Sequence, residues 1–380
     1  MAGPLAGIKV VELAGLGALP FGSLKLADMG AEVVRVDRLS DVPDDRTPRP
    51  HNFWDRGRRS IAVDLKDPRG VETVLRLAEG ADAFLEAFRP GVAERLGLGP
   101  DVLLARKPAL VYGRLTGWGQ DGPLAQVAGH SLNYEAITGA VGLIGPRGGP
   151  PPPPLTLLGD FAGGGLHLAY GVVCALLEAQ RSGRGQVVDA AMVDGVSSLL
   201  GVFHGMDAMG MMSEETGTNL FDGGAPFYNV YEARDGRYVS VASVEPHFYA
   251  LLLEKIGLDP ADLPEQYDEA CWPEMRERFA EVFRTRTRDE WSAILEGSDA
   301  CYAPVLTLAE AREYPHNRAR GVFLEGQATP ELAPTPRMSL TPGEPGRSPA
   351  WPGADTDAVL SEAGFSAEEV SALREAGTIP

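Results

Sequence analysis

The chain has 380 residues, and its 44% hydrophobic and 23% charged residues are typical of a globular protein of about two domains. A formal net charge of −19 argues against a nucleic-acid-binding protein. The cysteines Cys174, Cys271 and Cys301 are too few and too scattered for a disulfide framework, and no run approaches the roughly 18 apolar residues of a membrane span. We therefore expect a cytoplasmic protein without a nucleic-acid or membrane partner.

Short β-rich runs alternate with helix-compatible stretches in the first third of the chain. Residues 8–13 and 33–36 read as strands and residues 21–29 as the helix between them, which is a strand–helix–strand unit. The alternation continues with a strand at 61–63, a helix at 70–77 and strands at 83–85 and 109–112. The pattern predicts an α/β fold with a Rossmann-like, doubly wound parallel sheet.

The segment after the first strand, Gly15-Leu16-Gly17-Ala18-Leu19-Pro20, is similar to a dinucleotide-binding fingerprint. Pro20 stands where that fingerprint has its third glycine, and Asp37 is flanked by Val36 and Arg38 rather than closing the second strand cleanly. These departures argue against an NAD site.

The charge is uneven along the chain. From Arg35 to Arg69 there are nine Lys and Arg against seven Asp and Glu, a balance of 9 − 7 = +2. A basic window in an acidic protein suits a small anionic ligand. The alternative is a solvated, arginine-rich loop.

The second half of the chain changes in character. A Gly/Pro-rich loop at 145–154 precedes two apolar helical stretches, 160–179 and 192–212. Asp235-Gly236 then predicts a hairpin between 227–232 and 238–242. The remaining predicted helices cover 248–256, 273–283, 288–295 and 366–376, the last opened by a capping box of Ser366 and Glu369.

These elements predict two domains. We expect a large domain from 1–200 and 335–380, and a small α+β domain at 225–330. Residues 201–224 and 331–350 are expected to be linkers.

Three segments carry residues suited to chemistry. His130 directly follows Gly129 in a polar loop that leads into a helix, and an imidazole takes both protonation states near neutral pH. A satisfied structural histidine is the alternative for that segment. Glu245 stands before Pro246, at the end of a hairpin strand. A glutamate in this position often only opens a helix, which is the alternative for this segment.

Asp160 stands at the predicted start of a long helix, where a carboxylate can act as an N-cap. Gly163, Gly164 and Gly165 follow it, although each glycine in a helix costs roughly 1 kcal/mol against alanine. That cost is understandable if a ligand approaches the backbone there, for example a thioester oxygen that gains negative charge. The other histidines show no metal-ligand spacing, and we expect no metal; they are His51, His167, His204, His247 and His316.

Taken together, these segments resemble the 2-methylacyl-CoA racemases of the family III CoA-transferase (CaiB/BaiF) superfamily over residues 3–337. The motifs follow one another in order. They are Val33 to Arg38, Val63 to Lys66, Phe88 to Gly91, Thr116 to Gln120, the His130 loop, the Asp160 helix start, Gly185 to Ala190, Asp222 to Tyr228, and Glu245 to Tyr249.

The resemblance implies a large CoA-binding domain, a small domain and an interlocked homodimer, with CoA as part of the substrate and no separate cofactor. It implies that His130 and Asp160 are catalytic bases, supported by Glu245 from the partner's small domain. The implied CoA contacts are Arg38, Lys66 and Arg89 at the phosphates and pantetheine, and Ala62, Val63, Asp64, Leu65, Gly129, Asn133 and Tyr134 at the adenine and thioester ends. The resemblance also makes Met206, Met209, Met211 and Met212 a pliable acyl-binding surface.

The expected reaction follows from the residue types. A hydrogen beside a thioester carbonyl is weakly acidic, so its removal needs a base, and inversion needs a proton donor on the opposite face. An imidazole and a carboxyl group supply that pair, each acting as acid or base according to direction.

Two positions depart from the pattern of the family. Its histidine is usually followed by aspartate, here Ser131, and an asparagine usually stands four residues before the catalytic aspartate, here Thr156. One alternative is acyl transfer, in which Asp160 attacks the thioester and carries the acyl group as an anhydride; it has no evident need of an opposed imidazole. The other is a CoA-thioester-binding protein without catalytic activity.

Overall fold

The computed structural model describes residues 3–47, 53–325 and 330–380, and the chain forms two compact units. The large unit comprises Met1–Thr138, Pro154–Leu200 and Phe323–Pro380. The small unit comprises Gly139–Pro153 and Gly201–Val322. The chain thus leaves the large unit and returns to it near its C-terminus.

A six-stranded, entirely parallel sheet forms the centre of the large unit, with the order β3-β2-β1-β4-β5-β6. Its strands are β1 (Lys9–Leu13), β2 (Glu32–Arg38), β3 (Arg58–Val63), β4 (Ala83–Glu86), β5 (Val111–Thr116) and β6 (Val187–Ala191). The order reverses between β1 and β4, which is the switch point where open α/β sheets bind ligands. The predicted α/β fold class is confirmed, although β6 was not predicted as a strand.

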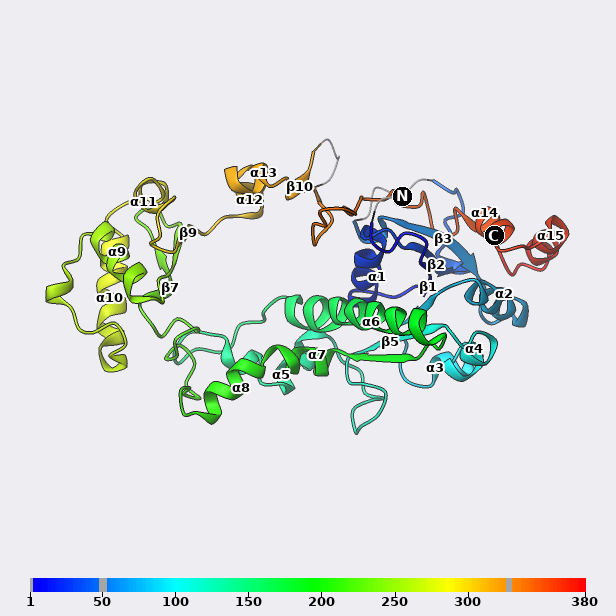
Figure 1. The fold of residues 1–380 in the computed structure, drawn as a ribbon, viewed down its shortest axis with the longest axis horizontal. Helices are drawn as coiled ribbons and strands as arrows, with labels where there is room; N and C mark the ends of the chain where they lie inside the picture. The colour runs from blue at the N-terminus through cyan, green and yellow to red at the C-terminus, as the bar shows by residue number, and fades with distance from the viewer. Residues whose placement is uncertain (1–2, 48–52, 326–329) are drawn as a thin grey trace. The chain divides into compact units, whose positions relative to one another are not determined.

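Helices cover both faces of this sheet (Figure 1). Successive residues of a strand point to opposite faces, so each strand contributes side chains to two cores. Val10 and Leu85 pack toward α1 (Ala18–Asp28) and α6 (His167–Ser182). Val11 and Phe84 belong to the opposite core. That core is closed by α2 (Pro68–Glu79), α4 (Pro100–Arg106), α14 (Thr356–Glu362) and α15 (Ala367–Glu375).

The C-terminal segment joins the sheet through specific contacts. The Asp355 carboxylate accepts from the Ser60 N–H at 2.9 Å, and the Asp64 N–H donates to the Thr378 carbonyl at 2.9 Å. The predicted capping box of α15 is confirmed, since the Ser366 N–H donates to the Glu369 carboxylate at 2.7 Å. Two short strands, β10 (Phe323–Leu324) and β11 (Glu331–Leu332), pair antiparallel where the chain returns.

The two long predicted helices differ from the structure. The first begins earlier, with a π-helical segment at Leu157–Leu166 that continues into α6. The second breaks into α7 (Met192–Leu199) and α8 (Gly201–Ala208), and the chain turns at Gly210, where φ is +69°. Only glycine takes that backbone conformation without strain, so the apolar run to residue 212 does not continue as helix.

The stretch Leu157–Ser182 is long and apolar enough, by length and composition, to cross a membrane, with a mean hydropathy of 1.4. The expectation that no segment is long and apolar enough to span a membrane is therefore wrong. A helix packed against a sheet meets the same criterion. Residues of α6 pack against β5 and α1, and 44% of the apolar window is buried.

The small unit contains an antiparallel sheet of β7 (Tyr228–Glu232), β8 (Tyr238–Ala242) and β9 (Tyr302–Pro304). The predicted hairpin at Asp235-Gly236 is confirmed, with Gly236 at φ +73°. The three helices predicted after it are also confirmed, as α9 (Pro246–Ile256), α10 (Trp272–Phe283) and α11 (Arg288–Leu295). Two shorter helices, α12 (Leu308–Glu313) and α13 (Pro315–Ala319), were not predicted.

Ion pairs within the large unit account for most arginines of the basic window. The pairs are Arg35 with Asp37 and Asp55, Arg56 with Asp28 and Glu331, Arg58 with Glu12, Arg59 with Glu362, and Arg69 with Asp67. These five arginines are therefore engaged by carboxylates of the protein itself. Residues 48–52 of the window, including His51, lie outside the described residues.

Candidate active site

A cavity of about 500 Å³ lies at the carboxyl ends of β1, β4 and β5; we call it the switch-point pocket. Loops that follow these strands supply Gly17, Arg89 and Trp118, and Met192 comes from the start of α7. The same cavity is lined by His130 and Asp160. Two residues thirty positions apart in the sequence thus meet at the edge of the sheet where α/β proteins bind ligands.

His130 is held at the entrance of α5 (Ser131–Ile137). Its backbone N–H donates to Asn133 Oδ1 at 3.0 Å, and its carbonyl accepts from the Asn133 N–H at 2.7 Å. Asn133 does not line the switch-point pocket, and its side chain accepts from the backbone of the helix start. Asn133 thus orients the histidine loop, and its expected contact with CoA stays a prediction.

Aromatic packing fixes the other side of this loop. The Tyr134 hydroxyl donates to the Gly129 carbonyl, and its ring lies edge-on to Trp118 with the ring centroids 4.6 Å apart. A Cβ on Gly117 would lie 1.9 Å from Tyr134 Cζ, so only glycine fits there. Gly129 and Tyr134 both line the switch-point pocket beside His130, which is exposed to it.

Asp160 lies inside the π-helical segment rather than at an N-cap. The Phe161 N–H donates to the Thr156 carbonyl, five residues earlier, at 3.3 Å, and Asp160 is not the capping residue. The predicted N-cap role is therefore wrong. Wide π-type turns are rare and recur at functional sites, and here the turn aims a carboxylate at the loop that follows β1.

Gly17 explains the broken glycine motif after β1. Its φ is +62°, and a Cβ on it would lie 3.2 Å from Asp160 Oδ2. A side chain at this position would press on the carboxylate. The motif thus makes room for Asp160 at the place where a dinucleotide fold would admit a pyrophosphate.

The three glycines after Asp160 permit contact between helices. A Cβ on Gly165 would lie 2.3 Å from the Ala18 carbonyl of α1, and one on Gly163 would lie 2.7 Å from the Val196 N of α7. Backbone of the protein itself approaches these glycines, which is sufficient reason for them. The expected approach of a ligand there stays a prediction.

Burial and neighbouring charges set the proton affinity of the site. Burial raises the pKa of Asp160, the nearby Glu135 raises it further, and His130 lowers it. Burial also raises the pKa of Tyr134, with the Asp160 charge adding to the effect and Arg89 opposing it. A carboxyl with a raised pKa holds its proton closer to neutral pH, which brings Asp160 nearer to the working range of an imidazole.

A second cavity, of about 720 Å³, adjoins the first at the ends of β1, β2 and β3; we call it the β2–β3 pocket. The two cavities share Ala14, Arg38 and Phe88 as lining residues. Exposed Arg38 and Lys66 give the β2–β3 pocket positive charge, and its apolar wall includes Leu65. The pair of pockets suits a long ligand with an anionic part and a reactive end.

Most of the residues expected to contact CoA line one of these two pockets; Asn133 and Ala62 do not. Val63, Asp64, Leu65 and Lys66 line the β2–β3 pocket, Arg89 lines the switch-point pocket, and Arg38 lines both. Ala62 lines neither, because it is fully buried within the sheet. Within the described parts of the chain, no three His, Cys, Asp or Glu side chains gather as metal ligands would.

Glu245 belongs to the small unit, whereas the pocket with His130 and Asp160 is lined by the large unit. It is exposed and stands at the N-cap position of α9, without a side-chain capping bond. Its charge contributes to the raised pKa values of Tyr267 and Cys301, after burial in both cases. The large unit therefore does not supply this third residue.

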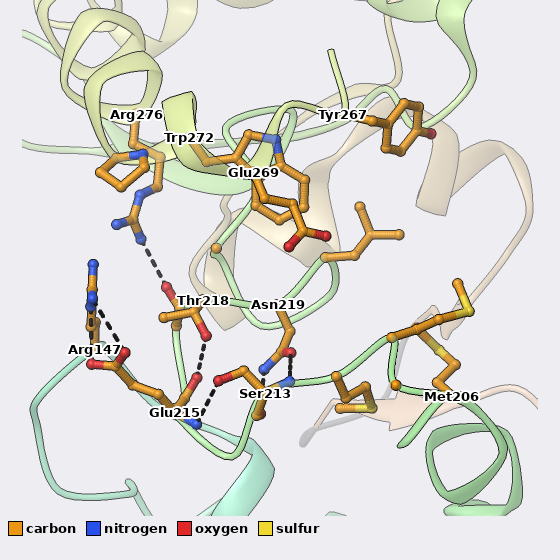
Figure 2. A pocket seen from close by; sticks show the side chains of 17 residues that line it. Arg147, Met206, Ser213, Glu215, Thr218, Asn219, Tyr267, Glu269, Trp272 and Arg276 are labelled. Carbon is orange, nitrogen blue, oxygen red and sulfur yellow. Dashed lines mark hydrogen bonds and ion pairs between the residues drawn. The ribbon is translucent and has the colours of Figure 1, made fainter. Parts of the chain in front are cut away.

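Three of the four methionines line a separate cavity of about 620 Å³ in the small unit. They are Met206, Met211 and Met212; Met209 is exposed and outside it. Figure 2 shows Met206 on one side of this cavity and Trp272 and Tyr267 on the opposite side. Such a wall of thioethers and rings adapts to apolar groups of different shape.

Sequence reasoning missed several residues of the site. Trp118 and Met192 line the switch-point pocket, and Glu135 touches the turn that carries Asp160. Glu135 had a detectable signal, since it stands four residues after Ser131 and thus on the same face of the helix. The pocket contacts of Trp118 and Met192 depend on loops that sequence patterns do not place.

The doubly wound sheet and the paired pockets at its switch point place the chain among the ligand-binding α/β proteins. Residues 5–357 match the sequence model of CoA-transferase family III, and the chain belongs to that family. It is 48% identical over 372 residues to a mouse protein named alpha-methylacyl-CoA racemase, with 97% of this chain and 96% of the mouse protein covered.

Two further comparisons agree with that assignment. The human protein of the same name is 43% identical over 379 residues, with 97% of this chain and 96% of the human protein covered. A crystal structure of a CAIB/BAIF family protein from Brucella suis matches with a TM-score of 0.82 at 27% identity, covering 96% of this chain and 100% of that one. The resemblance to 2-methylacyl-CoA racemases is confirmed.

Proposed function

We propose that this chain is an isomerase that racemises 2-methylacyl-CoA thioesters at C2. The observation that supports this proposal is that His130 and Asp160 line one pocket at the switch point of the sheet. The chain is also closely similar to two alpha-methylacyl-CoA racemases. An imidazole and a carboxyl group in one cavity form the acid–base pair that C2 inversion needs. CoA enters as part of the substrate, and the proton transfer needs no separate cofactor.

The proposed mechanism moves one proton onto the enzyme and another onto the substrate. One base removes the C2 hydrogen, the thioester becomes an enolate, and the conjugate acid of the other base protonates C2 on the opposite face. The roles of His130 and Asp160 exchange with the direction of reaction. Arg38 and Lys66 in the adjoining pocket are proposed to hold the phosphates of CoA.

Acyl transfer is the second candidate, because Asp160 could attack the thioester as a nucleophile. The pKa of Asp160 is raised, first by burial and then by Glu135, which suits a carboxyl group that must both hold and release a proton. His130 in the same pocket has a part in racemisation and none evident in transfer. The observations therefore favour proton transfer.

Incubation of the protein in deuterium oxide with one epimer of a 2-methylacyl-CoA separates the two candidates. We expect deuterium at C2 and conversion to a mixture of epimers, followed by NMR. A parallel incubation contains a carboxylic acid as acyl acceptor. Acyl movement to that acid without C2 exchange would instead establish a transferase, and binding without either change would establish a non-catalytic CoA-thioester-binding protein.

Lys66→Ala and Arg89→Ala are expected to weaken binding of the CoA thioester while leaving the fold intact. Lys66 lines the β2–β3 pocket and Arg89 lines the switch-point pocket, and both side chains are exposed. A hydrogen bond to a charged group contributes about 1.5–3 kcal/mol, so each Kd should rise roughly 10- to 150-fold. Isothermal calorimetry with CoA measures the change.

Arg106→Ala is the matched control for these two variants. Arg106 is a surface cation on α4, paired with Glu72 and Glu79, and it lines neither pocket. It should bind CoA as the unchanged protein does. Equal affinity in all four proteins would show that the pocket cations do not contact CoA.

We further propose that two chains associate and that Glu245 of the partner subunit completes each site. An apolar stripe along α6 and the turn before it supports association, because Leu166, Tyr170, Val173 and Leu177 are all exposed. Their spacing of four, three and four residues places them on one helix face. An exposed apolar face of this kind is typical of a protein–protein interface.

Co-refolding of His130→Ala chains with Glu245→Ala chains tests the shared site. If Glu245 acts across the interface, each heterodimer contains one site in which both residues are intact. Activity should then reappear, approaching one quarter of the unchanged protein in an equal mixture, because about half of the dimers are mixed and each has one good site. C2 exchange in the mixture is compared with each variant refolded alone. No recovery in dimers verified by light scattering would show that each site uses one chain.

A further inference from the structure

Glu135 is a fully buried carboxyl group on α5, with an exposed fraction of 0%. Its Oε1 accepts from the Ser131 hydroxyl at 2.7 Å and from the Gly159 N–H at 2.7 Å. Its Oε2 is buried and has no hydrogen-bond partner. One oxygen of this carboxyl group is thus hydrogen-bonded to the backbone next to Asp160, and the other oxygen makes no hydrogen bond.

The remaining contacts connect Glu135 to Asp160 itself. The Ser131 hydroxyl, while donating to Glu135, accepts from the Asp160 N–H at 3.1 Å. A Cβ on Gly159 would lie 2.3 Å from Ser131 Oγ and 2.9 Å from Glu135 Oε1, so only glycine admits this arrangement. Ser131 and Glu135 therefore clamp two successive amides of the π-helical turn, those of Gly159 and Asp160.

Other fully buried carboxyl groups of the large unit are paired with arginine. Glu12 pairs with Arg58, Asp28 with Arg56, and Glu86 with Arg114. In the part of the chain that the structure describes, Glu135 has no basic partner within ion-pair distance. Burying a carboxyl group without such a partner is costly, and a role at the neighbouring carboxyl group explains why it is kept.

Glu135 is the acidic group that acts most strongly on Asp160. Glu135 raises the pKa of Asp160, second only to burial, and His130 opposes it. Of the other elements packed on this turn, α7 carries Asp194, which is exposed and acts on Asp189. On α1, Lys25 and Asp28 influence each other's pKa, and Arg56 influences the pKa of both.

We propose that Glu135 is a positioning residue for Asp160: with Ser131 it clamps the π-helical turn and keeps the Asp160 carboxyl group ready to hold a proton. This inference rests on the proposed racemisation, in which Asp160 must be an acid in one direction and a base in the other. Glu135 stands one turn of α5 after Ser131, so both side chains face the Gly159 and Asp160 amides.

Glu135→Gln tests the inference through the pH profile of kcat/KM. The amide oxygen can still accept from Ser131 and Gly159, so the clamp is kept while the negative charge is lost. A nearby like charge disfavours ionisation, and its loss should lower the pKa of Asp160. On the acid side of the profile, kcat/KM falls because both bases become protonated. This acid limb should therefore move to lower pH by roughly one unit for either epimer.

Two companion variants are matched to this change. Ser131→Asp combined with Glu135→Gln returns a carboxylate to the clamp, because Ser131 Oγ lies 2.7 Å from Glu135 Oε1, and it should restore the limb toward its original pH. Glu12→Gln removes a buried carboxylate paired with Arg58 and should leave the limb in place. If Glu135→Gln does not fold in a thermal melt, Glu135→Asp, which draws the carboxylate back from Gly159 by one methylene, should move the limb to lower pH.

The outcomes separate this inference from the proposed function. C2 exchange by the unchanged protein, with the limb displaced in Glu135→Gln and restored in the double variant, supports the inference. Exchange with the same acid limb in the unchanged protein and Glu135→Gln, or in Glu135→Asp when that substitute is needed, overturns the inference alone. Absence of C2 exchange in the unchanged protein overturns the proposed function and the inference together.

Discussion

Replacing His130 by alanine is expected to abolish inversion at C2 while deuterium still exchanges into one epimer. Asp160→Ala should show the same behaviour with the opposite epimer. The reason is that each base, if the two face opposite sides of C2, abstracts the proton from one epimer only, and the base that remains returns a solvent proton to its own face. A positioned general base contributes about 10²–10⁴-fold, so inversion should fall at least by that factor. NMR of each epimer in deuterium oxide measures exchange and inversion separately.

Matched controls keep this result interpretable. His316→Ala and Asp101→Ala remove an exposed histidine on α13 and an exposed aspartate on α4, both outside the pockets, and both should racemise normally. A thermal melt must show that the Asp160 variant is folded, because this residue lies in a π-helical turn that packs on α1 and α7. Exchange into the same epimer by both variants, or inversion by either at nearly the original rate, would refute the two-base assignment.

The order of strands and helices could be predicted from the sequence because it depends on local signals. The strand–helix–strand unit at the start, the Asp235-Gly236 hairpin and the Ser366 capping box each depend on residues a few positions apart. β6 was missed because Val187 to Ala191 pair with β5, more than seventy residues earlier, and the run itself is short. Its place in the sheet is set by tertiary pairing.

The charged residues show where sequence reasoning fails. Arg56 looked like part of an exposed basic window, yet its partners Asp28 and Glu331 lie 28 and 275 positions away. No local pattern identifies such partners. The same holds for Gly163 and Gly165, whose crowding by α7 and α1 is visible only in three dimensions.

The candidate site was predictable mainly through the resemblance to a family. Nothing in the residues between His130 and Asp160 indicates that the two line one pocket, and a histidine loop or an N-cap aspartate would be ordinary structure. The CoA contacts carried over to Ala62 and Asn133 stay predictions, since the first is buried in the sheet and the second holds a backbone amide. Glu135 was invisible to that approach because it is not among the residues carried over from the family.

Replacing Arg56 by leucine is expected to cause a large loss of stability. Its guanidinium is almost fully buried and lies 2.7 Å from Asp28 Oδ2 and 3.2 Å from Glu331 Oε2, which joins α1 to the returning C-terminal segment. Leucine would leave two buried carboxyl groups without this cation. Breaking a buried ion pair from one side costs about 3–5 kcal/mol. Urea unfolding at neutral pH measures that difference as a lower midpoint.

The loss should depend on pH in a defined direction. Burial raises the pKa of Asp28, and Arg56 is the main influence that lowers it, so leucine should raise this pKa further. A carboxyl group whose folded-state pKa lies above its unfolded value stabilises the fold fully at low pH, and this contribution is lost as pH rises through the folded pKa. The deficit of the variant should therefore shrink as pH falls from neutral toward the ordinary carboxyl range.

Arg59→Leu is the matched control for the Arg56 variant. Arg59 also pairs with a carboxylate of the C-terminal segment, Glu362, but it does so at the surface. An exposed pair contributes about 0–1 kcal/mol, so its removal should shift the urea midpoint little. The difference between the two arginines isolates burial, because each variant loses the same side chain and a contact to the same returning segment. Equal effects of the two substitutions, or a deficit in Arg56→Leu that grows as pH falls, would show that the buried carboxyl groups are not the source of the loss.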